Sequence, residues 1–250
     1  MKFIRFLNTD ILAITQEDLL RDLKKGVLFT PNLDHLVKLQ KDRDFYEAYQ
    51  QAEWIVCDSM VLYFCSKFLK NKLPDVVPGS SFFTEFYRYH AADENCKIFL
   101  LGAMDGVAEK AKAKINAAVG REIIVGAHSP SFGFERKLDE IENIIQIVNE
   151  SGANVVLVGV GAPKQEKFIM KYKDRMPGVD IWMALGATID FEAGNISRAP
   201  IFMQKCAMEW LYRFFKEPKR MFRRYFLDDL KFFWLFLKQI LGVYKNPFKT

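Results

Sequence analysis

Short apolar runs that alternate with amphipathic segments of helical length restrict this chain to few folds. The runs are GVLFT (26–30), EWIVCD (53–58), CKIFLLG (96–102), REIIVGA (121–127), NVVLVGV (154–160) and DIWMALG (180–186). The helical segments that follow the first five are NLDHLVKLQ, SMVLYFCSKFL, MDGVAEKAKAKINAAV, RKLDEIENIIQIVNES and PKQEKFIMKYKD. Unbroken Val, Ile and Leu runs are typical of parallel strands covered by helices on both faces. The pattern therefore predicts a doubly wound, Rossmann-like α/β fold with right-handed crossovers.

The strand pattern ends near Pro200, which divides the chain into two predicted domains. Residues 1–199 are expected to form the α/β core, and residues 200–250 a helical appendage. The appendage is expected to break just before Pro218, because proline disfavours helical backbone at the residue before it.

The appendage carries the positive charge of the chain. Residues 198–250 hold 12 Lys/Arg and 4 Asp/Glu, a net +8, so the first 197 residues carry −3 of the total of +5. This asymmetry predicts an anionic partner, such as a phosphate, a lipid headgroup or nucleic acid. Along a continuous helix, Arg213, Arg220 and Arg224 would share one face, which either binds a diphosphate or is simply solvated.

Aromatic side chains lie between these basic residues, a composition that favours an anionic membrane surface as the partner. The aromatic residues expected to rest on lipid are Phe222, Phe226, Phe232, Phe233, Trp234 and Phe236.

Cysteine and histidine usage argues against disulfide and metal sites. The four cysteines form no CxxC pair, so we expect buried free thiols in a reducing cytosol. The three histidines are too few for a zinc cluster, and no metal-ligand spacing is present. We also expect no signal peptide and no membrane-spanning helix, because no apolar stretch is long enough.

Doubly wound folds bind ligands beyond the carboxyl ends of their strands. Asp58 stands at such an end, where its carboxylate can act as a general base or cap the next helix. Thr30 and Asn32 can contact a polar ligand, and Asn32 can instead cap a helix. Asp190 is another acid at a strand end with the same two readings.

The stretch VGVGAPKQEKFI joins a strand to a helix through a turn suited to a ligand. Gly159 and Gly161 permit a sharp turn and a close backbone approach. Pro163 suits a first helical turn, whose free N–H groups favour an anion. Gln165 can donate and accept hydrogen bonds, and Glu166 either contacts the ligand or complements the helix dipole. An ordinary turn with a cap explains the same residues.

Three further residues stand at predicted strand ends. Gly102 opens the turn GAMDG, which is weak support for a dinucleotide site and equally a plain turn. Gly186 ends the last strand. His128 is the one histidine at a strand end. His35 falls in a predicted helix, where a surface or packing role is expected, and His90 falls at a predicted helix end.

Together these motifs resemble the WecG/TagA/CpsF family of bacterial glycosyltransferases. The resemblance covers essentially the whole chain and rests on TPNLDHLV, Asp58, IFLLGAMDGVAEKA, VGVGAPKQEKF, ALGATIDFEAGNISRAP and EWLYRFFKEPKRMFRRY. It implies inverting transfer of a sugar from a UDP-sugar to a polyprenyl-diphosphate-linked glycan acceptor, without an essential metal or any cofactor. It also implies a peripheral protein on the cytoplasmic face of the bacterial plasma membrane, in cell-wall, teichoic-acid or exopolysaccharide synthesis.

The resemblance also implies roles for particular residues. The family's proposed base corresponds to Asp58, its active-site threonine and asparagine to Thr30 and Asn32, and its pocket glutamine to Gln165. The appendage arginines that the family is thought to bring over the diphosphate correspond to Arg213, Arg220 and Arg223. Ser59 stands where many members have a glycine, so the donor stays open among N-acetylmannosamine, its uronate and glucose.

Two other function classes stay open from the residues alone. A UDP-sugar epimerase that oxidises its substrate needs a dinucleotide fingerprint, which GAMDG does not supply. A non-catalytic basic module would bind a membrane or nucleic acid through the same aromatic and Arg-rich helix. The glycosyltransferase reading predicts no nucleic-acid partner, and it leaves the oligomeric state open, a homo-oligomer included.

Overall fold

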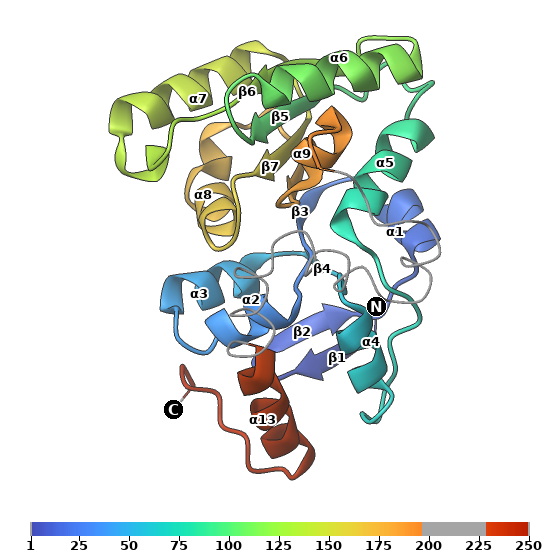
Figure 1. Cartoon of the computed structure of the whole chain (residues 1–250), viewed down its shortest axis with the longest axis vertical. Helices are drawn as coiled ribbons and strands as arrows, with labels where there is room; N and C mark the ends of the chain where they lie inside the picture. Colours follow the sequence, from blue (N-terminus) through green and yellow to red (C-terminus); the bar gives the residue numbers. More distant parts are fainter. Residues whose placement is uncertain (1, 197–228, 250) are drawn as a thin grey trace.

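The computed structural model describes residues 2–196 and 229–249, and the predicted Rossmann-like α/β fold is confirmed in it (Figure 1). The main sheet has six strands, all parallel, in the order β4-β3-β8-β7-β5-β6. Their bounds are β3 Gly26–Phe29, β4 Trp54–Ile55, β5 Ile98–Gly102, β6 Ile124–His128, β7 Val155–Gly159 and β8 Ile181–Ala184. The strands β4 and β6 form the two edges of the sheet, so the loops that follow β3, β8 and β7 lie toward its middle.

Helices cover both faces of the sheet. One face packs against α2 Leu33–Lys38, α3 Arg43–Gln51, α4 Met60–Ser66, α7 Leu138–Glu150 and α8 Lys164–Tyr172. The other packs against α1 Gln16–Asp22, α5 Gly79–Tyr89, α6 Val107–Val119 and α9 Thr188–Ala193. Two 3₁₀ turns span Phe134–Arg136 and Lys173–Arg175. Leu28 and Phe29 enter opposite layers, because successive side chains of a strand point to opposite faces.

A small antiparallel hairpin precedes the sheet, and the sequence pattern did not predict it. Its strands are β1 Phe3–Phe6 and β2 Thr9–Leu12, joined by a turn in which Leu7 has a φ of 53°. The side chain of Asn8 donates to the carbonyl of Leu39 at 2.7 Å and accepts from Gln40 Nε2 at 2.7 Å. The hairpin is thereby fixed to the end of α2.

Helix α13, Asp229–Ile240, packs on this hairpin at the lower end of Figure 1. Its Phe236 ring stacks on Phe6 with 5.8 Å between centroids, and Phe232 stacks on Phe236. Gln239 accepts from the backbone N–H of Leu7 at 2.7 Å and donates to a neighbouring carbonyl of β1 at 2.8 Å. These contacts make α13 part of the core rather than a loosely attached segment.

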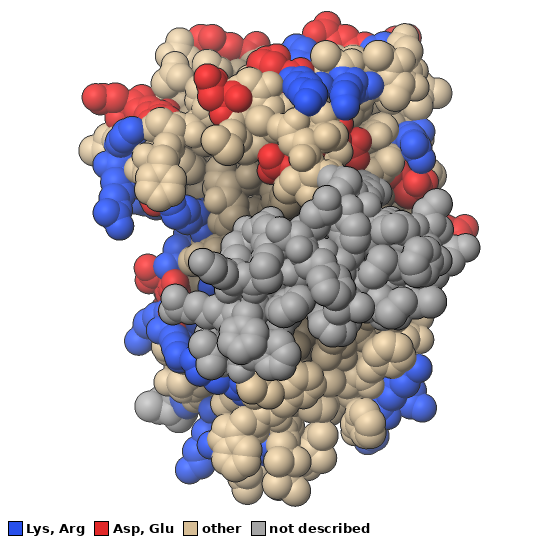
Figure 2. Space-filling model, in the orientation of Figure 1, with Lys and Arg blue, Asp and Glu red and all other residues tan. Residues whose placement is uncertain are grey.

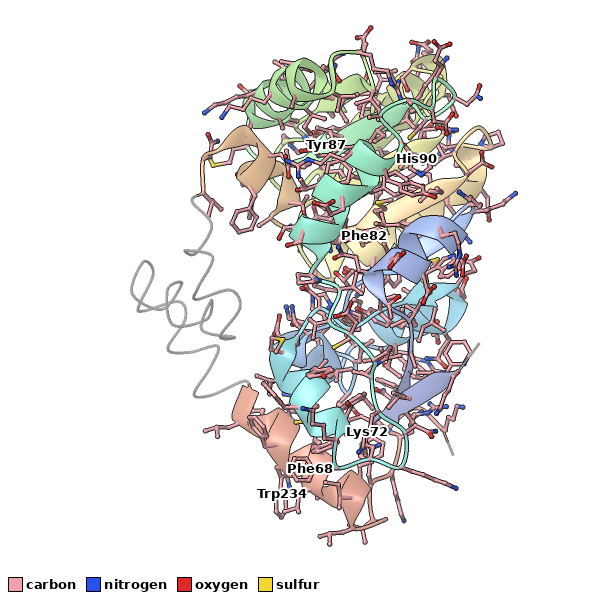
Figure 3. The ribbon with its side chains drawn as sticks, turned by 90° about the vertical axis from the view of Figure 1, so that its right-hand side faces the viewer. Phe68, Lys72, Phe82, Tyr87, His90 and Trp234 are labelled. Atoms are coloured by element: carbon pink, nitrogen blue, oxygen red, sulfur yellow. The ribbon has the colours of Figure 1, made fainter. Side chains whose placement is uncertain are left out.

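The prediction that Phe232 and Phe236 rest on lipid is therefore wrong, because both rings are buried. Phe233 and Trp234 of the same helix are exposed, and Trp234 lies at the lower end of the molecule in Figure 3. Within the described ranges, no helix has the length and apolarity needed to cross a bilayer.

Several sequence-based predictions lie outside the described residues. They concern the domain boundary at Pro200, the break before Pro218, and the residues Cys206, Arg213, Arg220, Arg223, Arg224, Phe222 and Phe226. The other three cysteines are free and buried, as expected. Burial raises the pKa of Cys57 to about 12 and those of Cys65 and Cys96 to about 11, so these thiols are poor nucleophiles.

Candidate active site

Loops that follow four neighbouring strands meet at the carboxyl edge of the sheet. They carry Asp58 after β4, Thr30 after β3, Gly186 after β8 and the turn 159–165 after β7. Loops after adjacent parallel strands lie on the same edge, which is where doubly wound folds bind ligands. The structure therefore brings these predicted site residues to one edge, and Gly102 and His128 follow β5 and β6 farther along it.

Asp58 is not the cap of the helix that follows it. The cap of α4 is Ser59, whose hydroxyl accepts from the N–H of Leu62 at 3.4 Å. The backbone N–H of Asp58 donates to the carbonyl of Pro31 at 3.2 Å, which joins the end of β4 to the turn after β3. Ser59 therefore takes the capping role, and the side chain of Asp58 is half-buried beside the turn after β3.

Asn32 has the structural role that the sequence left open. Its side chain caps α2 by accepting from the N–H of His35 at 3.3 Å. His35 is buried, and its Nδ1 lies 2.9 Å from the hydroxyl of Tyr49, so it belongs to the core as expected. The capping bond fixes the turn 30–32 beside Asp58.

Thr30 is buried where α5 begins, a contact that the sequence analysis missed. A Cβ on Gly79 would lie 3.3 Å from Thr30 Oγ1 and 2.8 Å from Leu185 Cδ2, so only glycine fits there without rearrangement. The sequence signal for this contact is PGS (78–80), where a proline and a glycine open a helix.

The turn after β7 is closed by a reciprocal pair of hydrogen bonds. The N–H of Gly161 donates to Gln165 Oε1 at 3.1 Å, and the N–H of Gln165 donates to the carbonyl of Gly161 at 3.1 Å. Gly161 has a φ of +86°, which favours glycine, and among the described residues other than its chain neighbours no atom lies within 4 Å of where a Cβ would stand. Pro163 is the N-cap of α8. The turn thus presents open backbone beside the first turn of a helix.

Glu166 is fully buried at the start of α8, which sequence reasoning did not anticipate. Its Oε1 accepts from Gln165 Nε2 at 3.0 Å, and its Oε2 has no hydrogen-bond partner. Burial raises the pKa of Glu166 to about 7, although the hydrogen bond from Gln165, the backbone N–H of Glu166 itself and the charge of Lys38 lower it. Burial is the main cause that raises the pKa of the Tyr49 phenol, and the negative charges of Glu166 and Asp58 raise it further.

Three of the predicted site glycines, Gly102, Gly159 and Gly186, lie where the ends of neighbouring strands approach each other closely. A Cβ on Gly102 would lie 2.5 Å from the carbonyl oxygen of Gly159. A Cβ on Gly159 would lie 2.7 Å from the carbonyl oxygen of Gly186. These contacts explain the need for glycine at Gly102 and Gly159 by backbone packing alone, whereas no described residue packs in this way against Gly161.

For Asp190 and His128, the structure gives a position, but no contact among the described residues assigns a role. Asp190 lies in the first turn of α9 but is not its cap, and burial raises the pKa of its carboxyl. His128 ends β6, and its Nε2 is buried without a hydrogen-bond partner. His90 is the C-cap of α5, as expected for a residue at a helix end.

An exposed aromatic platform borders the same edge. The ring of Phe132 is 97% exposed, and Lys164 Nζ lies 5.0 Å from its centroid. Lys164 also pairs with Glu135 at 2.8 Å, so the loop after β6 is held against the start of α8. Sequence reasoning missed Phe132 and Lys164. Their signal was an aromatic residue inside the Ser- and Gly-rich loop SPSFGF.

A second missed contact joins α9 to α5. Glu192 accepts from Thr84 Oγ1 at 2.6 Å and from the hydroxyl of Tyr87 at 3.1 Å. Nothing in the local sequence signals this long-range contact.

Among the residues that the structure describes, no three or more His, Cys, Asp or Glu side chains gather into a metal-ligand group. The comparison with protein families gives a clear match. The model of the family described as "Glycosyl transferase WecG/TagA/CpsF family" matches residues 4–246, nearly the whole chain.

Proposed function

Because the chain belongs to the WecG/TagA/CpsF family of glycosyl transferases, we propose which transfer it catalyses. The donor is a UDP-sugar carrying N-acetylmannosamine, its uronate or glucose, and the acceptor is a glycan linked to polyprenyl diphosphate. The reaction inverts the anomeric carbon and contributes to a bacterial cell-surface or secreted polysaccharide.

The position of Asp58 is the observation that carries this proposal. Its carboxylate stands at the carboxyl edge of the sheet, half-buried, with the capping role taken by Ser59. In the proposed step the acceptor hydroxyl attacks the anomeric carbon from the side opposite UDP. Asp58 takes the hydroxyl proton, and UDP leaves with the electron pair of the broken bond. A base beside the incoming oxygen is what an inverting displacement requires.

The open turn at Gly161 supports a subsite for the leaving diphosphate. A φ of +86° and free space at Gly161 let an anion approach the backbone at the start of α8. By family correspondence, Arg213, Arg220 and Arg223 would close over the same diphosphate, where charge-assisted hydrogen bonds are strongest. Thr30 would border the sugar, and Asn32 would hold the turn beside it.

The exposed ring of Phe132 supports a subsite for the nucleobase. An aromatic face next to Lys164, along the same edge as the Gly161 turn, suits a flat base attached to a diphosphate. Stacking on Phe132 would not require hydrogen bonds to the base, because the flat face of any base can stack on an aromatic ring.

The exposed side of α13 supports a peripheral location on an anionic membrane. Its exposed stripe is Leu230, Phe233, Trp234 and Leu237, and Leu241 just after the helix is exposed too, while Phe232 and Phe236 are buried. Large apolar side chains that stand exposed together on one helix form an apolar surface patch of the kind found at membrane or protein contacts. Neutral atoms dominate this lower end in Figure 2, with Lys and Arg beside them. In Figure 3 the exposed Phe68 lies at the same end as Trp234.

A transfer assay tests the proposal. The protein is incubated with radiolabelled UDP-sugars and a short-chain polyprenyl-diphosphate acceptor, and labelled lipid product is separated by chromatography. Transfer from at least one donor supports the proposal. Isomerised donor without acceptor would indicate the epimerase instead, and no reaction with any donor would leave the basic binding module.

A further inference from the structure

The orientation of the Gln165 amide is fixed by its two partners. The backbone N–H of Gly161 is a donor, so the amide oxygen of Gln165 must face it. The amide nitrogen then faces Glu166, whose Oε1 has to accept. Glu166 is therefore the last link of a hydrogen-bonded chain that ends at the open glycine turn.

The surroundings of Glu166 favour its neutral form. Oε1 is an acceptor in both protonation states, so a proton on Glu166 resides on Oε2, which accepts no hydrogen bond from the described residues. An ionised Glu166 would leave a buried carboxylate oxygen without a hydrogen bond, and burial disfavours that charged form. Lys38 offers little compensation, because it is paired with Asp34 at 2.8 Å.

Among the described residues, the Lys side chains nearest to Glu166 are each paired with a carboxylate. The charges of Asp34 and Lys38, both on α2, influence the carboxyl of Glu166. The Tyr49 phenol on α3 is influenced by the charges of Glu166 and Asp58. Within α8, Lys164 is paired with Glu135, and Lys167 is paired with Asp42 at 2.7 Å. A second negative charge beside Asp34 would be repelled.

We propose that Glu166 is a positioning residue that acts as the neutral acid: it holds the Gln165 amide in the orientation that closes the glycine turn over residues 161–165. The consequence for UDP rests on the proposed function. An anion bound at the turn favours the protonated acid, so UDP binding takes up protons, and its affinity falls as the pH rises through about 7.

Two variants and a matched control test this role. Glu166→Gln reproduces the neutral acid, with an oxygen for Gln165 and a donor in place of the Oε2 hydroxyl. Glu166→Leu keeps the burial but removes the acceptor. Glu150→Leu makes the same exchange on the exposed side of α7. Hydrogen exchange of the Gly161 amide reports the turn directly, without any ligand.

We expect exchange at Gly161 to be unchanged in Glu166→Gln and Glu150→Leu and about tenfold faster in Glu166→Leu, the effect of losing one supporting hydrogen bond. Calorimetry with UDP between pH 6 and 8 should show weaker binding at high pH in the wild type. Over this pH range, the loss of UDP affinity should be about tenfold smaller in Glu166→Gln than in the wild type. Tenfold is the factor that corresponds to a change of one unit in the pKa of Glu166 when UDP binds.

Slow exchange in Glu166→Leu would overturn the positioning role. Fast exchange in Glu166→Gln would show that the carboxylate form is required, which also overturns the proposal. If the wild type neither binds UDP nor transfers sugar, the proposed function fails, while the exchange measurement still decides the role of Glu166.

Discussion

At the scale of single residues, the carboxylate of Asp58 is the group that the chemistry depends on. Asp58→Asn keeps the shape of the side chain but removes its basicity, so we expect turnover to fall by about 10²–10⁴-fold. Binding of the donor, measured by calorimetry, should stay near the wild-type value. Asp190→Asn is the matched control. A near-normal rate in folded Asp58→Asn, with a large loss in Asp190→Asn, would transfer the base role to Asp190.

Phe132 gives a second prediction at this scale. Phe132→Ala should raise the KM for the donor by roughly 5- to 150-fold, because stacking on a base contributes about 1–3 kcal/mol. Phe132→Trp should restore most of the affinity. Phe68→Ala removes another exposed ring, far from the candidate active site, and should leave KM unchanged in an assay with a water-soluble acceptor. Equal KM values for all these variants would remove Phe132 from the nucleobase subsite.

The residue-scale predictions from sequence were limited by side chains with two uses. Asn32 and Asp58 both suited a cap or a ligand, and only the observed bonds separate them: Asn32 caps α2, whereas Ser59 replaces Asp58 as the cap of α4. The burial of Gln165 was readable, because it precedes Phe168, Ile169 and Tyr172 at helical spacing. The burial of Glu166 was not, since a first-turn glutamate is usually solvated.

At the scale of elements, α13 connects the end of the chain to its beginning. Phe236→Ala should lower the free energy of unfolding by about 3–5 kcal/mol, because it empties a buried site between Phe6 and Phe232. Trp234→Ala, on the exposed side of the same helix, should change it by less than about 0.5 kcal/mol. Urea unfolding measures both. Equal losses, or no loss at Phe236, would mean that α13 does not contribute to the core as described.

The elements of the sheet were predictable because its strands are apolar on both faces. All six predicted runs contain a strand, although β4 is reduced to Trp54–Ile55. The hairpin β1–β2 was missed because its strands are short and its support is distant: Asn8 bonds to the end of α2, and Leu7 bonds to Gln239. The packing of α13 was missed for the same reason, since its apolar sequence does not say which side meets protein.

At the scale of the whole molecule, the first question is whether the reaction needs a metal ion. The sequence has no acidic pair of the DxD kind at a strand end, so we expect transfer to survive excess EDTA. The physical reason is that helix-start N–H groups and arginines can stabilise the leaving diphosphate in place of a cation. Loss of activity in EDTA, followed by recovery on adding Mg²⁺ or Mn²⁺, would contradict this.

The second question is how the molecule meets its lipid-linked acceptor. If the exposed stripe of α13 rests on the bilayer, Trp234→Ser with Leu237→Ser should weaken vesicle binding at both low and high salt, because salt does not screen apolar burial. Lys231→Gln with Lys238→Gln should weaken it only at low salt, since each basic residue near an anionic surface contributes about 1 kcal/mol that salt screens.

Sedimentation with vesicles of phosphatidylglycerol and phosphatidylcholine, at low and high salt, measures these two terms separately. Phe132→Ala is the control, because it removes an exposed ring next to the candidate active site rather than on α13. Transfer to a water-soluble acceptor should stay normal in the α13 variants, since their defect lies in reaching the membrane and not in the chemistry. Undiminished binding of the Trp234 and Leu237 variant at high salt would show that α13 does not face the lipid.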